Sequence, residues 1–575
     1  MTMSTPRRPR SDADEELGFS KATPVHWLSP LMLINTAAQV LLSNVFGEYL
    51  DKRDLQEQLP ATIFREGADG EEFWFDFVAD LGDGFNSTYS IAYLLAQDTV
   101  TLDGLPPLPR GQILVMGGDE IYPTPNWQRY TDKTKGPYMA AMPVAPESGP
   151  QPNMYALPGN HDWYDGLTSF MRLFAKDGND HVGGWNNAQA RSYFAIELPQ
   201  RWRIFAIDTQ FGAYIDDAQL AYFHAAASRL EPGDRVILCT PTPSWVEAVD
   251  NPGAYDPVDY FVRTVLNPVG ATIKLMLSGD LHHYAHYAPT GDGDRHLIHC
   301  GGGGAYLYPT HRMPEQIPVP PPPTQTHKPA EPTRPYDLSA VFPTKAQSRR
   351  YAAGVFWRAP RYNVGFVAML GIVQTAFMLS LLGLFEHASE LTTKWLVLPI
   401  AITGAVILGA GILYANSPTD SRLHVTRRSV LGTVHGIAQI GIGVLGTWGW
   451  SRLDLSHNDW PWPIPATLIY LVVMGIVATM VFCGYMLFAS MFDVNLNELF
   501  SGQSIIDSKS FLRIHIATDG TLTIHPVAIP KVSRKWRATP DAVPTASWLE
   551  PAEPIKIGLA EPPIVISSLV SYRSE

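Results

Sequence analysis

The stretch that decides the fold is LPGNHDWYDG, residues 157–166, in which polar side chains directly follow a Pro-Gly pair. The apolar run NMYALP before it and the Pro-Gly pair predict a strand that ends in a turn. Asn160, His161 and Asp162 would then lie at a strand end, where sites form in α/β sheets. Gly-Asn-His also occurs in ordinary loops, so a functional interpretation depends on partners elsewhere in the chain.

Other apolar or β-branched runs between residues 60 and 312 also end in polar clusters. They include FWFDFVAD before LGDG, QILVM before GGDEIYP, RVILC before TPTPSW and IKLML before SGDLHHYAHY. Helical patterns between several of these runs predict a layered α/β domain whose strand-end loops gather on one face. Those loops supply carboxylates, imidazoles, an amide and a phenol: Asp80, Asp83, Asp119, Tyr122, Asn160, His161, Asp280, His282 and His283.

Carboxylate, imidazole and phenol ligands together suit a hard-to-borderline metal ion. Two ions about 3.5–4 Å apart can clamp a phosphoryl group and activate a water molecule. A neighbouring imidazole can protonate the leaving oxygen. Each loop alone could be a plain turn, but a series of ligand-bearing loops at successive strand ends favours a metal-dependent hydrolytic site.

The series resembles the calcineurin-like metallophosphoesterases, and within them the purple acid phosphatase pattern. Its motifs are Asp80-Leu81-Gly82, Gly118-Asp119-Glu120-Ile121-Tyr122, Gly159-Asn160-His161-Asp162 and Gly279-Asp280-Leu281-His282. The likeness runs from Asp80 to His311. It implies a β-sandwich flanked by helices for residues 60–312, and the hydrolysis of a phosphate monoester or diester.

The resemblance implies two divalent or Fe/Mn-type metal ions. The first would be held by Asp80, Asp119, Tyr122 and His282, and the Tyr122 phenolate would favour ferric iron. The second would be held by bridging Asp119, Asn160 and Asp280, which stands where the family has a histidine. The family's lone histidine after RVILC is absent, so the second site either favours Mn, Mg or Ca over Zn or is empty. Asp83, His283 and His286 are the alternatives that could fill the gap.

The resemblance also implies that His161 protonates the leaving oxygen and that Asp162 orients the His161 imidazole. Two functions follow from the altered second site. The first is a working phosphoesterase, which the intact Asn160-His161-Asp162 motif favours. The second is a catalytically impaired sensor or scaffold that binds one metal ion or a phosphate ligand without turnover.

Four apolar runs after residue 360 predict membrane-spanning helices, at Val364–Phe385, Trp395–Ala415, Ser429–Trp450 and Ile464–Phe492. Each has the roughly 20 residues needed to cross a bilayer. Arginine and lysine gather before the first run and between the second and third, so the catalytic domain and both termini are predicted to be cytoplasmic. The runs carry almost no ionisable residues, which favours an anchor over a transporter. An anchor would keep the domain near the bilayer, which suggests a lipid-linked phosphate ester as substrate.

Composition agrees with a membrane part, because charged residues make up only 17% of the chain, against the usual quarter. The net charge of −13 disfavours a nucleic-acid partner. The remaining segments are predicted as a disordered tail (1–24), an amphipathic helix region with a fifth span as the alternative (25–58), a Pro-rich linker (313–360), and a small β-rich C-terminal unit with a tail (500–575). In that last unit Asp519-Gly520 predicts a hairpin turn.

Overall fold

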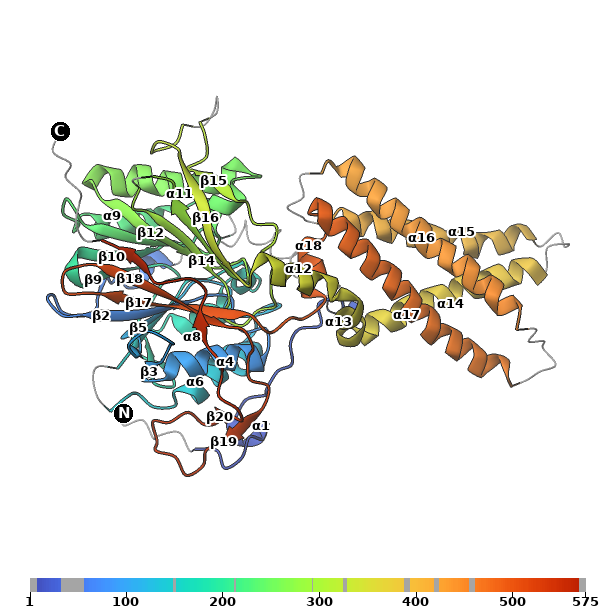
Figure 1. The fold of residues 1–575 in the computed structure, drawn as a ribbon, viewed down its shortest axis with the longest axis horizontal. Helices are drawn as coiled ribbons and strands as arrows, with labels where there is room; N and C mark the ends of the chain where they lie inside the picture. Colours follow the sequence, from blue (N-terminus) through green and yellow to red (C-terminus); the bar gives the residue numbers. More distant parts are fainter. Residues whose placement is uncertain are drawn as a thin grey trace. The chain divides into compact units, whose positions relative to one another are not determined.

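The computed structural model describes residues 8–30, 32, 56–147, 151–210, 214–291, 293–323, 328–386, 393–417, 423–453 and 461–567. The chain divides into two compact units (Figure 1). The α/β unit comprises residues 1–25, 36–345 and 506–575, and the helical unit comprises residues 26–35 and 346–505. Most of the expected amphipathic helix region, residues 31 and 33–55, lies outside the described residues.

The first sheet of the α/β unit has nine strands in the order β1-β9-β10-β11-β12-β14-β13-β16-β15. Neighbours from β10 to β14 run parallel, and the pairs on either side of them include antiparallel ones. In chain order the strands are β1 (Phe64–Arg65), β9 (Phe194–Leu198), β10 (Trp202–Ala206), β11 (Arg235–Cys239), β12 (Thr272–Ser278), β13 (Tyr284–Pro289), β14 (His296–Cys300), β15 (Gln316–Val319) and β16 (Arg334–Phe342).

The second sheet has the order β21-β18-β17-β2-β5-β6-β8-β7, with β22 also pairing with β18. Strands β2, β5, β6 and β8 are parallel, so the loops that follow them leave from one edge. In chain order the strands are β2 (Phe73–Val78), β5 (Ile113–Met116), β6 (Asn153–Ala156), β7 (His181–Val182), β8 (Trp185–Asn187), β17 (Lys509–Ile516), β18 (Leu522–Ile529), β21 (Gly558–Leu559) and β22 (Ile564–Ile566).

A buried apolar layer joins the two sheets face to face. Phe75 and Phe77 of the second sheet share one cluster with Trp202, Ile204 and Leu275 of the first. Helices cover the outer faces, as Figure 1 shows: α9 (Asp217–Ala227) and α11 (Asp256–Phe261) on the first sheet, and α4 (Phe85–Ala96), α6 (Gly136–Ala141) and α8 (Thr168–Phe174) on the second. The α/β unit is therefore built of large mixed sheets with flanking helices.

The C-terminal strands, expected as a small β-rich unit within residues 500–575, continue the second sheet. β17 pairs antiparallel with β2, with Ile514 opposite Phe75, and β18 pairs with β17. Arg513 of β17 forms a buried ion pair with Asp76 of β2, with Nε 2.8 Å from Oδ1. The backbone of β17 thus pairs with the edge of β2, which would otherwise expose unpaired backbone groups.

Two other segments also differ from the expectations. The segment 313–360, expected as a linker, contains β15 and β16 of the first sheet and then α12 (Lys345–Ala353) and α13 (Val355–Tyr362). Pro318 within β15 is tolerated because β15 is an edge strand of the first sheet. Within the expected tail, α1 spans Asp14–Leu17, and the buried side chains of Leu17 and Phe19 belong to the core.

The helical unit contains helices long and apolar enough to cross a membrane. They are α14 (Val364–Glu386), α15 (Thr393–Ala415), α16 (Val425–Ser451) and α17 (Pro463–Ala489), with spans of mean hydropathy 2.0, 2.1, 1.4 and 2.4. Glycines allow close approach, since a Cβ at Gly411 would lie 2.6 Å from the Gly432 carbonyl oxygen of the neighbouring helix. The Gln374 side chain donates to the Gln439 carbonyl at 3.0 Å.

Candidate metal centre

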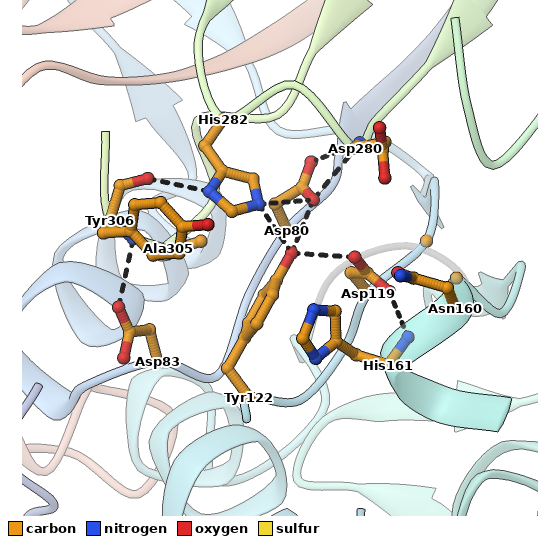
Figure 2. A network of polar contacts seen from close by, with 12 residues as sticks. Asp80, Asp83, Asp119, Tyr122, Asn160, His161, Asp280, His282, Ala305 and Tyr306 are labelled. Carbon is orange, nitrogen blue, oxygen red and sulfur yellow. Dashed lines mark hydrogen bonds and ion pairs between the residues drawn. The ribbon is translucent and has the colours of Figure 1, made fainter. Parts of the chain in front are cut away.

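The polar loops after β2, β5, β6 and β12 converge (Figure 2). Asp80, Asp119 and Asp280 each adopt positive φ angles, of 63°, 54° and 71°. Aspartate tolerates this left-handed conformation better than most residues, which lets each chain turn sharply after its strand. The turns are bonded to one another: Asp80 N donates to Gly118 O at 2.9 Å, and Asp280 N donates to Asp80 Oδ2 at 2.9 Å.

Glycine is required where the loops pass closest to one another. A Cβ at Gly159 would collide with the carboxylate of Asp119. Gly82 has a φ of 63°, and a Cβ there would lie 2.6 Å from the Glu120 carbonyl oxygen. The Gly82 of the first motif and the Gly159 of the third are thus explained by packing around the Asp119 loop.

The Tyr122 hydroxyl lies at the centre of the cluster and is fully buried. It lies 2.8 Å from Asp80 Oδ1, 2.9 Å from Asp119 Oδ2 and 2.9 Å from His282 Nε2 (Figure 2). A phenol has one proton to donate. Three acceptor atoms therefore compete for a single hydrogen atom. Additional protons or a bound cation would satisfy the acceptors that are left without it.

The tautomer of His282 follows from its other nitrogen. Nδ1 lies 2.9 Å from the Tyr306 carbonyl oxygen, which can only accept, so Nδ1 carries the proton. The lone pair of Nε2 then points at Tyr122 and Asp80, as in histidines that bind metal ions. Potential ligand atoms of Asp80, Asp119 and His282 all lie within 4.8 Å of one another, and all three residues are buried.

Electrostatics agree with a cation site. Burial raises the pKa of Asp80 well above its usual value, and the neighbouring charges of Asp119 and Asp280 raise it further. Burial also raises the pKa of Asp119 and lowers that of His282 well below its usual value. Crowded carboxylates beside a neutral imidazole are stabilised by a bound cation, because its charge reverses these shifts.

Asn160 supplies an oxygen on the other side of Asp119. Its Nδ2 lies 3.3 Å from the Tyr164 hydroxyl, but its Oδ1 is buried and accepts no hydrogen bond from any of the described residues. A buried carbonyl oxygen without a donor is costly, and a metal ion would satisfy it. Asp119 reaches both sides, since its Oδ2 contacts Tyr122 while its Oδ1 accepts the backbone N–H of His161 at 2.9 Å.

The structure places His161 at the site but gives Asp162 a different role from the expected one. His161 Nδ1 donates to the Pro123 carbonyl at 2.6 Å, and its ring lies 4.3 Å from that of Tyr122. Asp162 is fully buried and accepts hydrogen bonds from the backbone N–H groups of Gly159 and Glu120 and from the Tyr130 hydroxyl. The Pro123 carbonyl, not Asp162, therefore orients the imidazole, while Asp162 fixes the loop.

The alternative ligands do not converge on the cluster. Asp83 accepts the backbone N–H groups of Val25 and Tyr306, at 2.8 and 3.0 Å. His283 pairs with His299, and His286 lies between Glu561 and His296. Each of these side chains has its own polar partners and lacks the shared centre that surrounds Tyr122.

A cavity of about 420 Å³ opens beside Asn160 and Asp280. At the Thr240–Thr242 turn, the chain presents hydroxyl groups to this cavity. The cavity is lined by Asn160, Thr209, Gln210, Thr240, Thr242, Ser244, Glu247, Asn251, Gly253, Ala254, Pro257, Val258 and Asp280. Ser244 Oγ is buried and has no partner among the described residues. Among the described lining residues, the charged groups are the carboxylates of Glu247 and Asp280.

The sequence did not identify the groups that hold the candidate ligands and their loops in place. The Tyr306 carbonyl orients His282, and the buried Lys133 donates to the Tyr122 carbonyl at 2.8 Å. Lys509 of β17 donates to the Ala305 carbonyl at 2.5 Å. A backbone carbonyl leaves no mark in a sequence. The sequence does not distinguish a buried lysine from an exposed one, so no signal identified these residues.

Comparisons with known proteins add little to this geometry. No protein-family model matches the chain, and no curated protein matches it. Among solved structures, one titled "Structure of PhoD" aligns with 48% of this chain and 70% of its own, at 12% identity and a TM-score of 0.27. At this level of similarity the functional assignment rests on the side chains of the site.

Proposed function

We propose that this chain is a membrane-anchored, metal-dependent phosphoesterase with a calcineurin-like, purple acid phosphatase-type site. The observation that carries the proposal is the excess of acceptors around Tyr122. Asp80, Asp119 and His282 all face one phenolic proton. The Oδ1 of Asn160 also lacks a donor among the described residues, so a second position has an acceptor without a partner. Both positions fit cations.

The residues divide between two ion positions. Asp80, Asp119, Tyr122 and His282 would hold the first ion, and Asp119, Asn160 and Asp280 would hold the second. Bound ions would stabilise charge on the phosphoryl oxygens and lower the pKa of an attacking water. An anionic oxygen set with one imidazole suits Fe, Mn, Mg or Ca better than a soft, thiolate-binding metal.

His161 acts as the proton donor to the leaving oxygen. Its Nδ1–H is held by the Pro123 carbonyl, so the reactive proton is carried at Nε2. Asp162 contributes by fixing the loop 159–162, through the bonds that it accepts from Gly159 and Glu120. Loss of Asp162 would therefore misplace Asn160 and His161 together, without changing which groups do the chemistry.

The cavity supports a substrate with a polar alcohol group. Hydroxyl and amide side chains dominate its lining, and none of the described lining residues is lysine or arginine. Charge on a phosphate would thus be met by the ions and His161, while the alcohol occupies the cavity. The apolar helices would anchor the chain in a bilayer with the α/β unit on the cytoplasmic side, where a lipid-linked phosphate ester is a suitable substrate. A tag at residue 1 that reacts with an impermeant reagent on intact cells would contradict this orientation.

A sensor or scaffold without turnover is the second candidate. The observation that favours it is the absence of a histidine at the Thr240–Thr242 turn, which removes one ligand from the second position. A single ion at Asp80, Asp119, Tyr122 and His282 would then report on metal or phosphate without cleaving an ester.

Elemental analysis of the purified full-length protein beside Asn160→Ala tests these alternatives. Two ions per chain, falling to one or fewer in the variant, support the dinuclear hydrolase, and hydrolysis of bis(p-nitrophenyl) phosphate should fall with them. Asn251→Ala is the matched control, because Asn251 lines the same cavity but is not a proposed ligand. One ion in both proteins, with no hydrolysis, favours the sensor. No ion in either protein refutes both.

A further inference from the structure

Lys509 is an unusual residue for its position. It is the first residue of β17, its side chain is fully buried, and its Nζ donates to the Ala305 carbonyl at 2.5 Å. A buried ammonium is expensive unless nearby groups compensate its charge. The other proposed site residues come from the chain before residue 283, whereas Lys509 comes from after the last apolar helix.

The loop that Lys509 holds is the loop that orients His282. Ala305 N donates to the Asp80 carbonyl at 2.9 Å, so this residue bridges Lys509 and the end of β2. The next residue, Tyr306, donates its N–H to Asp83 and accepts the Nδ1 proton of His282 (Figure 2). The carbonyl that Lys509 binds is thus one residue before the carbonyl that fixes the imidazole.

The strand and the loop also meet through their backbones. Ser510 N donates to the Gly302 carbonyl at 3.1 Å, and a Cβ at Gly302 would collide with Ser510. Gly303 N donates to the Ala79 carbonyl at 2.9 Å on the opposite side. The loop 301–306 is therefore clamped between the start of β17 and the end of β2, and Lys509 closes the clamp at the end nearest the cluster.

The charge of Lys509 matches its surroundings. The buried Asp83 carboxylate has Lys133 and Lys509 as its stabilising cations, and burial lowers the pKa of each lysine to about 8. Asp80 also stabilises the ammonium of Lys509. The ammonium therefore belongs to the electrostatic surroundings of the candidate metal centre as well as to the strand.

We infer that Lys509 is a positioning residue for the first metal ion: it fixes the Ala305–Tyr306 carbonyls, and through them the His282 imidazole, so that the site is completed by the strand that follows the helical unit. This inference rests on the proposed metal site. It predicts that removal of the Lys509 ammonium weakens metal binding, although Lys509 touches no proposed ligand.

The test measures Mn²⁺ affinity of the full-length protein by chelator competition, for wild type, Lys509→Met and Lys509→Arg. We expect Lys509→Met to bind Mn²⁺ about 10- to 100-fold more weakly, the usual range for groups that orient a metal ligand. Lys509→Arg should recover most of the affinity because it restores a cationic donor. The melting temperature of each metal-free protein shows whether the variant is folded.

Arg513→Met is the matched control. It also removes a buried cation from β17, but its partner is Asp76, away from the cluster. It should lower the melting temperature and leave Mn²⁺ affinity unchanged. If Lys509→Met does not fold, Lys509→Gln replaces it with the same expected loss.

Two results would overturn the inference: wild-type affinity in Lys509→Met, or an equal loss of affinity in Arg513→Met, which would mean that β17 matters only for general stability. A wild-type protein that binds no Mn²⁺ or other ion would instead refute the proposed metal site itself. The two failures are therefore distinguishable.

Discussion

Replacing Tyr122 with phenylalanine should change how metal affinity depends on pH. Burial raises the pKa of Tyr122 well above its usual value, and the charges of Asp119 and Asp80 raise it further. The metal-free protein therefore keeps the phenolic proton throughout the accessible pH range. If Tyr122 binds the first ion as a phenolate, that proton must leave when the ion enters.

The size of the effect follows from counting protons. Each proton released on binding makes the affinity rise tenfold per pH unit, or about 1.4 kcal/mol. Wild type should release the Tyr122 proton and, while Asp80 is protonated, a second one, because the pKa of Asp80 is also raised. The slope of log affinity against pH should therefore be steeper by about one in wild type than in Tyr122→Phe, which lacks the phenolic proton.

The sign for stability is opposite in the metal-free protein. Because the folded pKa of Asp80 and Asp119 exceeds the unfolded value of 3.8, the stability gained from protonation is present below that value and is lost as pH rises through the raised pKa. The lowered pKa of His282 acts the other way below its unfolded value of 6.5. The carboxyls should therefore lower the melting temperature of the metal-free protein as pH rises from 3.8 through their raised pKa values, and added metal should remove this trend.

Chelator-competition titrations of Mn²⁺ between pH 6 and 8 measure both slopes, and the uptake or release of protons in weak buffer gives an independent count. Tyr164→Phe is a suitable control, since its hydroxyl contacts Asn160 and Tyr164 is not a proposed ligand of the first ion. Equal slopes for wild type and Tyr122→Phe would refute the assignment of Tyr122 as a phenolate ligand. A slope near zero in wild type would refute the protonated cluster as a whole.

Two further predictions concern the proton donor and the C-terminal strand. His161→Asn should retain its metal ions but lose about 10²–10⁴-fold in turnover on alkyl phosphate esters, with a smaller loss on p-nitrophenyl esters, whose leaving group needs no proton; equal losses on both would exclude the proposed role. Arg513→Met should cost about 3–5 kcal/mol of stability, because it leaves Asp76 buried without its bidentate partner. Urea unfolding of the full-length protein measures this cost, and a change below about 1 kcal/mol would show that the ion pair is not intact in solution.

The converging loops were the most predictable part of this protein. Asp80, Asp119 and Asn160 each follow an apolar run by a few residues, and the ends of neighbouring parallel strands in one sheet necessarily lie together. Asp280 follows β12 of the other sheet, so its place beside them depends on how the two sheets pack. The four apolar helices were predictable for a similar reason, since length and composition alone distinguish them. Both predictions depend on signals carried by neighbouring residues.

Features that depend on distant partners were not predictable. The hairpin at Asp519-Gly520 is visible in the sequence, but nothing local shows that its first strand pairs with β2, more than four hundred residues earlier. The donors to Asp162 were not predictable for the same reason, because they are set by how the Glu120 and Tyr130 segments fold around the buried carboxylate. The Pro-rich segment was expected to be a spacer because proline is typical of linkers. An edge strand also tolerates proline, and the sequence does not distinguish the two cases.

The place of β17 beside β2 also imposes a parity rule on the membrane topology. The chain leaves the α/β unit after β16 and rejoins it at β17, so it must return to the side from which it departed. If helices cross a bilayer between these strands, they can do so only an even number of times. Deleting or inverting a single apolar helix would place β17 on the opposite side of the membrane from β2. The second sheet would then lack the β17–β2 pair. The integrity of the α/β unit would therefore report directly on whether an even number of helices has been inserted.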